Sequence, residues 1–352
     1  MNYKEARENA ILLVLGGSHA YGTNTETSDE DERGVVIAPL DCYFGLNKFA
    51  QAEDKVNDGV IYNIQKFVDL ALKANPNIWD LLWSEKIISI NKLGEKLRDN
   101  RNLFLSSKAR WTFSGYAFAQ LKRIKTHRGY LLGNHPKAQP DPADYGIDTK
   151  WKMGKDELGA IDALADSLID EFEEQLYKGA YAIGDDGRVT LNKERARGII
   201  IQILTGERKE ESASILNFSD EVMEIYSRVK RYHQAMNEWN KYKAWKEHRN
   251  KARANLEKKF GYDTKHAMQL VRLLRQGHEI LELGVVNVWR SDAKDLLEIR
   301  NGLWSFTQLD DFADKMEKAF DELYKTTKLP KTPNFKEAEN LLVELISEYH
   351  RK

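Results

Sequence analysis

The sequence contains one cysteine, Cys42, and no long hydrophobic run. A single cysteine excludes an internal disulfide and any metal site built from several cysteines. No apolar run approaches the roughly 18 residues of a membrane span. The apolar run at residues 11–15 is also too short for a signal peptide and leads directly into a glycine pair. We therefore expect a cytoplasmic protein without membrane contact.

An excess of charge of either sign is also missing, because the net charge is −1. The charges are nevertheless segregated along the chain. Residues 101–137 hold eight Lys or Arg and no acid, residues 156–174 hold eight acids and no base, and residues 228–259 hold eleven Lys or Arg against three Glu. Aromatic residues are interleaved with both basic blocks. This pattern favours a helical domain with a basic face for a phosphate backbone, and the alternative is a pair of solvated helices.

The most informative stretch lies at residues 16–22. The apolar run before it has the length of a strand and ends at Gly16 and Gly17, which predicts a strand buried on both faces. Glycine lets the backbone turn sharply and approach a ligand closely. The amides that follow can converge on an anion, above all if a short helix begins near Ser18. The sequence therefore predicts a phosphate site at this turn.

A second strand is predicted over residues 28–37. Side chains alternate along a strand, so Asp29, Asp31 and Arg33 would share one face while Glu30 and Glu32 point the other way. Two carboxylates a few ångströms apart beside a phosphate site are tolerable when divalent cations lie between them. The pattern indicates a magnesium site.

The two motifs together resemble the nucleotidyltransferase superfamily of DNA polymerase β. The sequences Gly-Ser-His-Ala-Tyr-Gly-Thr and Ser-Asp-Glu-Asp-Glu-Arg-Gly-Val are similar to motifs of the RlaP family, which is associated with RNA repair. The run Tyr-Asp-x-Lys-His-Ala at residues 262–267 is shared with the same family, so the resemblance covers most of residues 11–305. It implies an α+β fold. Residues 1–100 would form a catalytic domain with a small mixed sheet, and residues 101–352 a mainly helical domain that binds nucleotide and acceptor.

The resemblance also implies the site residues. Asp29, Asp31 and a third carboxylate from a later strand would hold two Mg²⁺ ions, with Mn²⁺ as an alternative. Alignment of Tyr62 with the family's usual tyrosine makes Asp58 the third acid, with Asp54 as the fallback. The predicted nucleotide ligands are Gly17, Ser18, Tyr21, Arg33, Lys265, His266 and Arg272, and the predicted acceptor-binding residues are Lys122, Arg123, Lys125 and Arg128.

For several of these residues, a structural role is the alternative to ligand binding. Lys265 and Arg272 contact phosphate or are surface cations, and His266 is a ligand or a core histidine. Arg33 neutralises a triphosphate or holds the carboxylates in place. One departure from the superfamily is that residues 30 and 32, commonly apolar there, are glutamates that need water or basic partners.

The function implied is transfer of a nucleoside monophosphate from a nucleoside triphosphate to an RNA or other nucleic-acid end in RNA repair, with release of pyrophosphate. One alternative is transfer to a protein side chain or a small molecule, and another is nucleotide or RNA binding without catalysis. The sequence leaves open which triphosphate is used, whether a template is read, the acceptor and the oligomeric state.

Further elements follow from local patterns. A third strand is predicted at residues 59–64, running into a helix through Leu72, and Asn75 is expected to cap the next helix. Trp79 and Trp83 in that helix are interpreted as core. Helices are also predicted at residues 108–128 and 158–176, a hairpin at 178–190, and a helix capped by residue 263 or 264.

Overall fold

The computed structural model describes residues 1–147 except 27 and 55, the short segments 181–183 and 189–191, and residues 220–351 except 248 and 250. Two compact units are present. The first combines Met1–Leu131 with Lys251–Lys352, and the second is Leu132–Asn250. The predicted functional division at residue 100 stays a prediction. Within the described ranges, no helix has both the length and the apolar composition that crossing a membrane requires.

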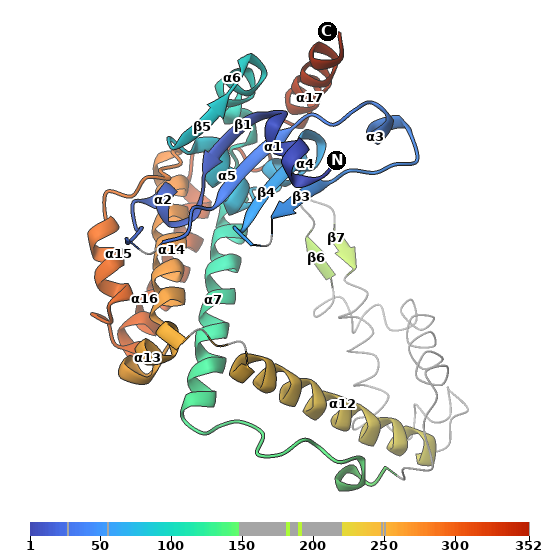
Figure 1. Ribbon diagram of the computed structural model, residues 1–352. Helices are drawn as coiled ribbons and strands as arrows, with labels where there is room; N and C mark the ends of the chain where they lie inside the picture. The colour runs from blue at the N-terminus through green and yellow to red at the C-terminus, as the bar shows by residue number, and fades with distance from the viewer. Residues whose placement is uncertain are drawn as a thin grey trace. The chain divides into compact units, whose positions relative to one another are not determined.

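A mixed five-stranded sheet forms the N-terminal part of the first unit (Figure 1). The strand order is β3 (Gln51–Asp54), β4 (Gly59–Asn63), β2 (Glu32–Val36), β1 (Ala10–Leu15) and β5 (Ile87–Ile90). β2 and β4 run parallel, and the other neighbours are antiparallel. The parallel pair matters for the site, because it brings the start of β4 beside the start of β2.

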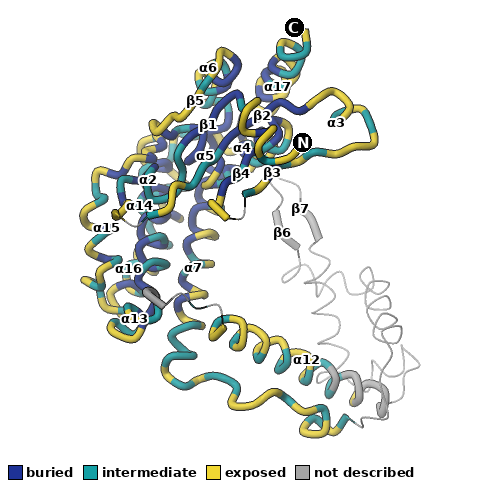
Figure 2. The backbone as a smooth tube through the Cα atoms, viewed as in Figure 1, coloured by how far each residue is buried: buried dark blue, intermediate teal, exposed yellow. Residues whose placement is uncertain are grey.

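β1 is the buried centre of this sheet. Its residues from Ile11 to Val14 are at most 2% exposed, as the dark tube in Figure 2 shows. Leu13 packs with Ala6 of α1 (Tyr3–Glu8) on one face. On the other face Val14 belongs to a cluster with Leu345 of α17 (Phe335–His350). The predicted strand buried on both faces is confirmed.

Three further helices cover the same face as α17. They are α4 (Ile64–Leu72), α5 (Pro76–Trp83) and α6 (Lys92–Asp99). The predicted passage from β4 directly into α4 is confirmed, and so is the cap of α5, where Asn75 Oδ1 accepts from the amide of Asn77 at 3.0 Å. Trp79 is fully buried and Trp83 packs beside it, in agreement with their interpretation as core. Short elements complete this part: α3 (Asp41–Phe44) and η1 (Arg101–Phe104).

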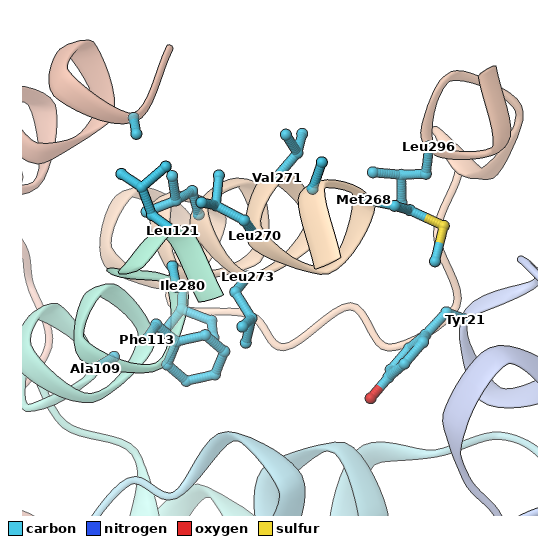
Figure 3. Packing of buried hydrophobic residues seen from close by; sticks show 14 of the residues in the cluster. Tyr21, Ala109, Phe113, Leu121, Met268, Leu270, Val271, Leu273, Ile280 and Leu296 are labelled. Atoms are coloured by element: carbon cyan, nitrogen blue, oxygen red, sulfur yellow. The ribbon is translucent and has the colours of Figure 1, made fainter. Parts of the chain in front are cut away.

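The rest of the first unit is helical. α7 (Ala109–Leu131) packs along α14 (Thr264–Leu283), which also contacts α13 (Lys251–Phe260), α15 (Ala293–Arg300) and α16 (Phe306–Thr326). Figure 3 shows this core, where Phe113 and Leu121 of α7 meet Leu270 and Leu273 of α14. Asp263 caps α14 as predicted. A small mixed sheet followed by a mainly helical region confirms the predicted fold class.

The second unit contains α12 (Asp220–Glu247), η2 (Pro142–Tyr145) and the strands β6 (Tyr181–Ile183) and β7 (Val189–Leu191). β6 and β7 pair antiparallel, in agreement with the predicted hairpin. The helix predicted at residues 158–176 lies outside the described residues.

Candidate functional site

The glycine turn brings the end of β1 directly against Asp31. The amide of Gly16 donates to the carbonyl of Asp31 at 2.7 Å. Gly17 has a left-handed backbone with φ of +56°, and a Cβ at this position would overlap Oδ2 of Asp31. The half-buried Ser18 follows in the first turn of the short helix α2 (Gly17–Tyr21). Asp31 can therefore lie on the turn only because residue 17 has no side chain.

The strand after the turn is shorter than predicted. β2 begins at Glu32 rather than at residue 28, because its partner β1 ends at Leu15, which pairs with Glu32. Asp29 and Asp31 therefore lie in the segment leading into the strand and not on it. Asp29 is exposed, and Asp31 is half-buried.

The charges of the other predicted site residues act on Asp31. The pKa of Asp31 is raised chiefly by burial. Among its charged neighbours, Arg33 and Lys265 lower this pKa, whereas Asp58 and Asp29 raise it. The charges of two acids and of two predicted nucleotide-binding cations thus reach Asp31, and they come from three separate segments of the chain, residues 29–33, Asp58 and Lys265.

Asp58 lies in the turn before β4 and beside Arg33. Its backbone is left-handed with φ of +49°, and the parallel register pairs Arg33 with Val60, two residues further along the chain. Arg33 donates to the backbone carbonyl of Asp58, and its Nη2 lies 3.3 Å from Oδ2 of that residue. The Asp58 side chain is 75% exposed, so solvent cations can reach it. The fallback Asp54 instead lines a hollow on the opposite face with Glu32. Asp29 lines this hollow too, whereas Arg33 does not, so the structure does not show the predicted common face of Asp29 and Arg33.

These acids do not form a closed metal cage. Among the described residues, the ligand atoms of one group, His127, Glu257 and Asp263, all lie within 4.8 Å of one another. The oxygens of the predicted aspartates are not gathered that closely. Two of the three aspartates are exposed, so their side chains can turn toward a cation without moving the backbone.

The opposite face of β2 explains the glutamate at position 32. Glu32 accepts hydrogen bonds from Nε and Nη2 of Arg7 at 2.6 and 2.7 Å, and from the hydroxyl of Tyr3 at 3.1 Å. The hydrogen bond from Arg7 holds the pKa of Glu32 below its usual value, although burial opposes this. The basic partner that this residue needs therefore comes from α1.

A cavity of about 550 Å³ adjoins the glycine turn. Its walls come from the glycine turn and α2, from β2, β3 and β4, and from α5, α7 and α14. Tyr21, Arg33 and Arg272, all predicted nucleotide ligands, line it. Two acids, Glu53 and Asp80, oppose the two arginines, so the charged lining is close to neutral.

Asp80 is a polar centre that sequence reasoning missed. It lies in α5 and accepts hydrogen bonds from Tyr21 at 2.7 Å, from Gln276 at 2.8 Å and from Arg272 at 3.2 Å. The segment was interpreted only for its packing tryptophans. The available signal was a carboxylate one residue after Trp79 in a mostly apolar helix, because a buried charge needs partners.

His266 and Lys265 lie at the start of α14. Nδ1 of His266 is 2.6 Å from Oδ2 of Asp263, and Nε2 is 3.2 Å from Nη1 of Arg123. Neighbouring side chains therefore satisfy both ring nitrogens. A role of either residue in nucleotide binding stays a prediction.

The predicted basic face lies on α7, and three of its four side chains contact neighbouring elements. Arg123 meets His266, Lys125 pairs with Asp310 at 2.7 Å, and Arg128 donates to the carbonyl of Gly261 at 3.0 Å. Lys122 is exposed. The structure thus places these residues on one helix, and acceptor binding by them stays a prediction.

A protein-family model matches the N-terminal part of the chain. Residues 3–131 match the model described as RlaP, RNA repair pathway DNA polymerase beta family, which confirms the predicted resemblance over this part of the chain. Its predicted extension to residue 305 stays a prediction. The matched residues include β1 to β5, the glycine turn and all three predicted aspartates. Comparisons with curated proteins and with solved structures give no match. The match supports a polymerase β-like nucleotidyltransferase of RNA repair, and nucleotidyltransferases of this kind typically use divalent metals.

Proposed function

We propose that the protein transfers a nucleoside monophosphate from a nucleoside triphosphate to an RNA end and releases pyrophosphate. The observation that carries this proposal is the contact of Asp31 with the Gly16–Gly17 turn, because a carboxylate beside a glycine turn could hold the metal ions of a triphosphate bound at that turn. The family match of residues 3–131 supports the reaction class.

The donor set suits magnesium. Asp29, Asp31 and Asp58 offer carboxylate oxygens, the ligands that hard divalent cations prefer. Bound magnesium, as two ions, would lower the pKa of the attacking hydroxyl and neutralise charge on the departing pyrophosphate. Manganese is the alternative ion.

The remaining residues would bind and orient the nucleotide. The backbone amide of Gly17 and the hydroxyl of Ser18 are proposed to contact the terminal phosphates. Arg33 pairs with Asp58 in the structure, and we propose that it exchanges this partner for a phosphate oxygen. Lys265, whose charge acts on Asp31, is proposed to approach the same triphosphate. These residues supply positioning and charge stabilisation, which dominate catalysis of phosphoryl transfer.

Two further contacts belong to the nucleotide proposal. His266 is held by Asp263 and Arg123, so its ring is oriented before any ligand arrives. Tyr21 faces the cavity beside the turn and is proposed to lie near the sugar or base.

The acceptor is proposed to lie along α7. Lys122 and Arg123 are exposed there, and Lys125 and Arg128 follow on the same helix. Binding of a phosphate backbone to such cations weakens steeply with salt.

Purified protein incubated with each α-labelled triphosphate, magnesium and total RNA tests the proposal. Label in RNA is expected, and it should disappear in Asp29→Ala plus Asp31→Ala while persisting in Asp54→Ala, because hydrogen bonds from residues 56 and 57 already occupy the Asp54 carboxylate. Label in protein would favour the protein-modifying alternative. Nucleotide binding without any turnover would favour the non-catalytic one.

A further inference from the structure

Asp80 connects three helices at the wall of the cavity. It belongs to α5, is 6% exposed, and is bonded to Tyr21 of α2 and to Arg272 and Gln276 of α14. Tyr21 is the last residue of the helix that starts at Gly17. The position of Asp80 therefore links the glycine turn to α14.

Asp80 also fixes how Arg272 presents its donors. The guanidinium carbon lies 3.8 Å from the centre of the Tyr21 ring, Nη1 donates to Asp80 and to Gln276, and Nε donates to Gln269. Nη2 has no hydrogen-bond partner among the residues that the structure describes, although Arg272 is 4% exposed and lines the cavity. A buried guanidinium with one open edge is a preorganised donor.

The hydroxyl of Tyr21 stays protonated in this arrangement. Burial raises the pKa of Tyr21 well above its ordinary value, although the charge of Arg272 opposes this shift. The hydroxyl is therefore a donor to Asp80 at neutral pH. The carboxylate also balances the charge of Arg272, so the pair adds no net charge to the cavity.

We propose that Asp80 is a positioning residue that holds Arg272 against Tyr21 so that Nη2 donates to an acceptor atom of a bound nucleoside triphosphate. Asp80 itself makes no contact with the nucleotide, and its effect passes through Arg272. The inference rests on the proposed function, because it takes the triphosphate as the guest of this cavity.

A double-mutant cycle tests whether Asp80 affects nucleotide binding through Arg272. The dissociation constants of ATP, GTP, CTP and UTP with magnesium are measured for the wild type, Asp80→Asn, Arg272→Gln and the double variant. Consider the triphosphate that the wild type binds best. We expect each single variant to raise its dissociation constant by about tenfold, the loss typical of one hydrogen bond to a charged group. The double variant should bind no more weakly than Arg272→Gln alone.

The matched control removes a carboxylate from another buried arginine. Arg110 is 2% exposed and pairs with Asp321 at 2.8 Å, and neither residue lines the cavity. Asp321→Asn should leave nucleotide affinity unchanged, even if it lowers the unfolding midpoint. If Asp80→Asn does not fold, Tyr21→Phe replaces it in the cycle, because this variant removes one donor to Asp80 and keeps the ring under Arg272.

The outcomes separate the two claims. Unchanged affinity in the folded Asp80 variant, or losses that simply add in the double variant, would overturn the positioning role while the proposed function stands. A wild-type protein that binds none of the four triphosphates would refute the proposed function and this inference with it.

Discussion

Two carboxylates one residue apart have opposite surroundings in this protein. Glu32 accepts two hydrogen bonds from Arg7, and its pKa is lowered. Asp31 lies against Gly17, and its pKa is raised chiefly by burial. A carboxylate with an arginine partner mainly holds structure together, whereas one whose ionised form is disfavoured is suited to a site that receives a cation. At the scale of the residue, environment separates the two roles.

Gly17→Ala should disrupt the site directly. The backbone is left-handed there, and the added methyl group would overlap Oδ2 of Asp31. We expect a loss of stability of about 1–3 kcal/mol, as for other strained backbone positions, and a larger relative loss of nucleotidyl transfer. Urea unfolding and the labelling assay measure the two effects. Gly115→Ala in α7 is the control, because nothing lies within 4 Å of its added methyl group. Equal activity in both variants would contradict the close approach of Asp31.

Asp58 and Asp54 provide a matched pair for the third carboxylate. Asp54 ends β3 and Asp58 lies in the turn before β4, and of the two only Asp58 contacts Arg33. Asp58→Asn should reduce turnover by at least about 100-fold, as expected for loss of a group that stabilises transition-state charge. Asp54→Asn should retain turnover. The reverse result, measured under identical magnesium concentrations, would reassign the third ligand to the fallback residue.

At the scale of the element, α1 stabilises the sheet by pairing with the outer face of β2. Ala6 is buried against Leu13 and Val36, and Tyr3 and Arg7 reach Glu32. This pairing lets β2 carry a charged residue where the wider superfamily commonly has an apolar one. The resemblance showed that a glutamate at position 32 is unusual. Its pairing with Arg7, 25 positions away in the sequence, could not be predicted from a local pattern.

The pairing predicts a pH dependence of stability. A pKa that is lower in the folded state than in the unfolded state contributes stability above the unfolded value, and this contribution is lost as pH falls through the folded value. Glu32→Gln should therefore cost about 1 kcal/mol at pH 7, and its difference from wild type should shrink in acid. Urea unfolding of both proteins at pH 7 and at successively lower pH values measures the effect. Glu30→Gln, at an exposed position, serves as control. A constant difference at all pH values would contradict this account.

At the scale of the molecule, residues far apart in sequence complete the core of the five-stranded sheet. α17 lies near the end of the chain, yet Ala338, Leu341 and Leu345 pack into the cluster that includes Ile11 and Val14 of β1. The family match ends at residue 131, but the compact unit includes residues 251–352. The matched segment is therefore not the whole folding unit.

Leu345→Ala tests this dependence. Leu345 is fully buried, so its truncation should cost about 2–5 kcal/mol, the usual range for a large apolar side chain in a core. Val343 lies on the same helix and is 58% exposed, so Val343→Ala should change stability by less than about 0.5 kcal/mol. Urea unfolding monitored by tryptophan fluorescence compares the two. Similar midpoints would mean that α17 does not stabilise the sheet.

Local signals predicted much of this fold and part of the site. The apolar run of β1, the passage from β4 into α4 and the Asn75 cap depend on neighbouring residues and were predictable. β3 and β5 were not predicted, because edge strands of four residues are too short to show periodicity, and β3 is mainly polar. The Asp80 network was missed because its partners are 59 to 196 positions away.

Release of pyrophosphate tests the central claim most directly, because every nucleotidyl transfer produces it whatever the acceptor. The wild type is incubated with each of the four triphosphates, magnesium and RNA, and pyrophosphate is quantified beside Asp31→Asn and the Asp54→Asn control. We predict magnesium-dependent release by the wild type and by Asp54→Asn, and at least about 100-fold slower release by Asp31→Asn. Equal release by wild type and Asp31→Asn, or none from any triphosphate, would contradict a nucleotidyltransferase site at the glycine turn.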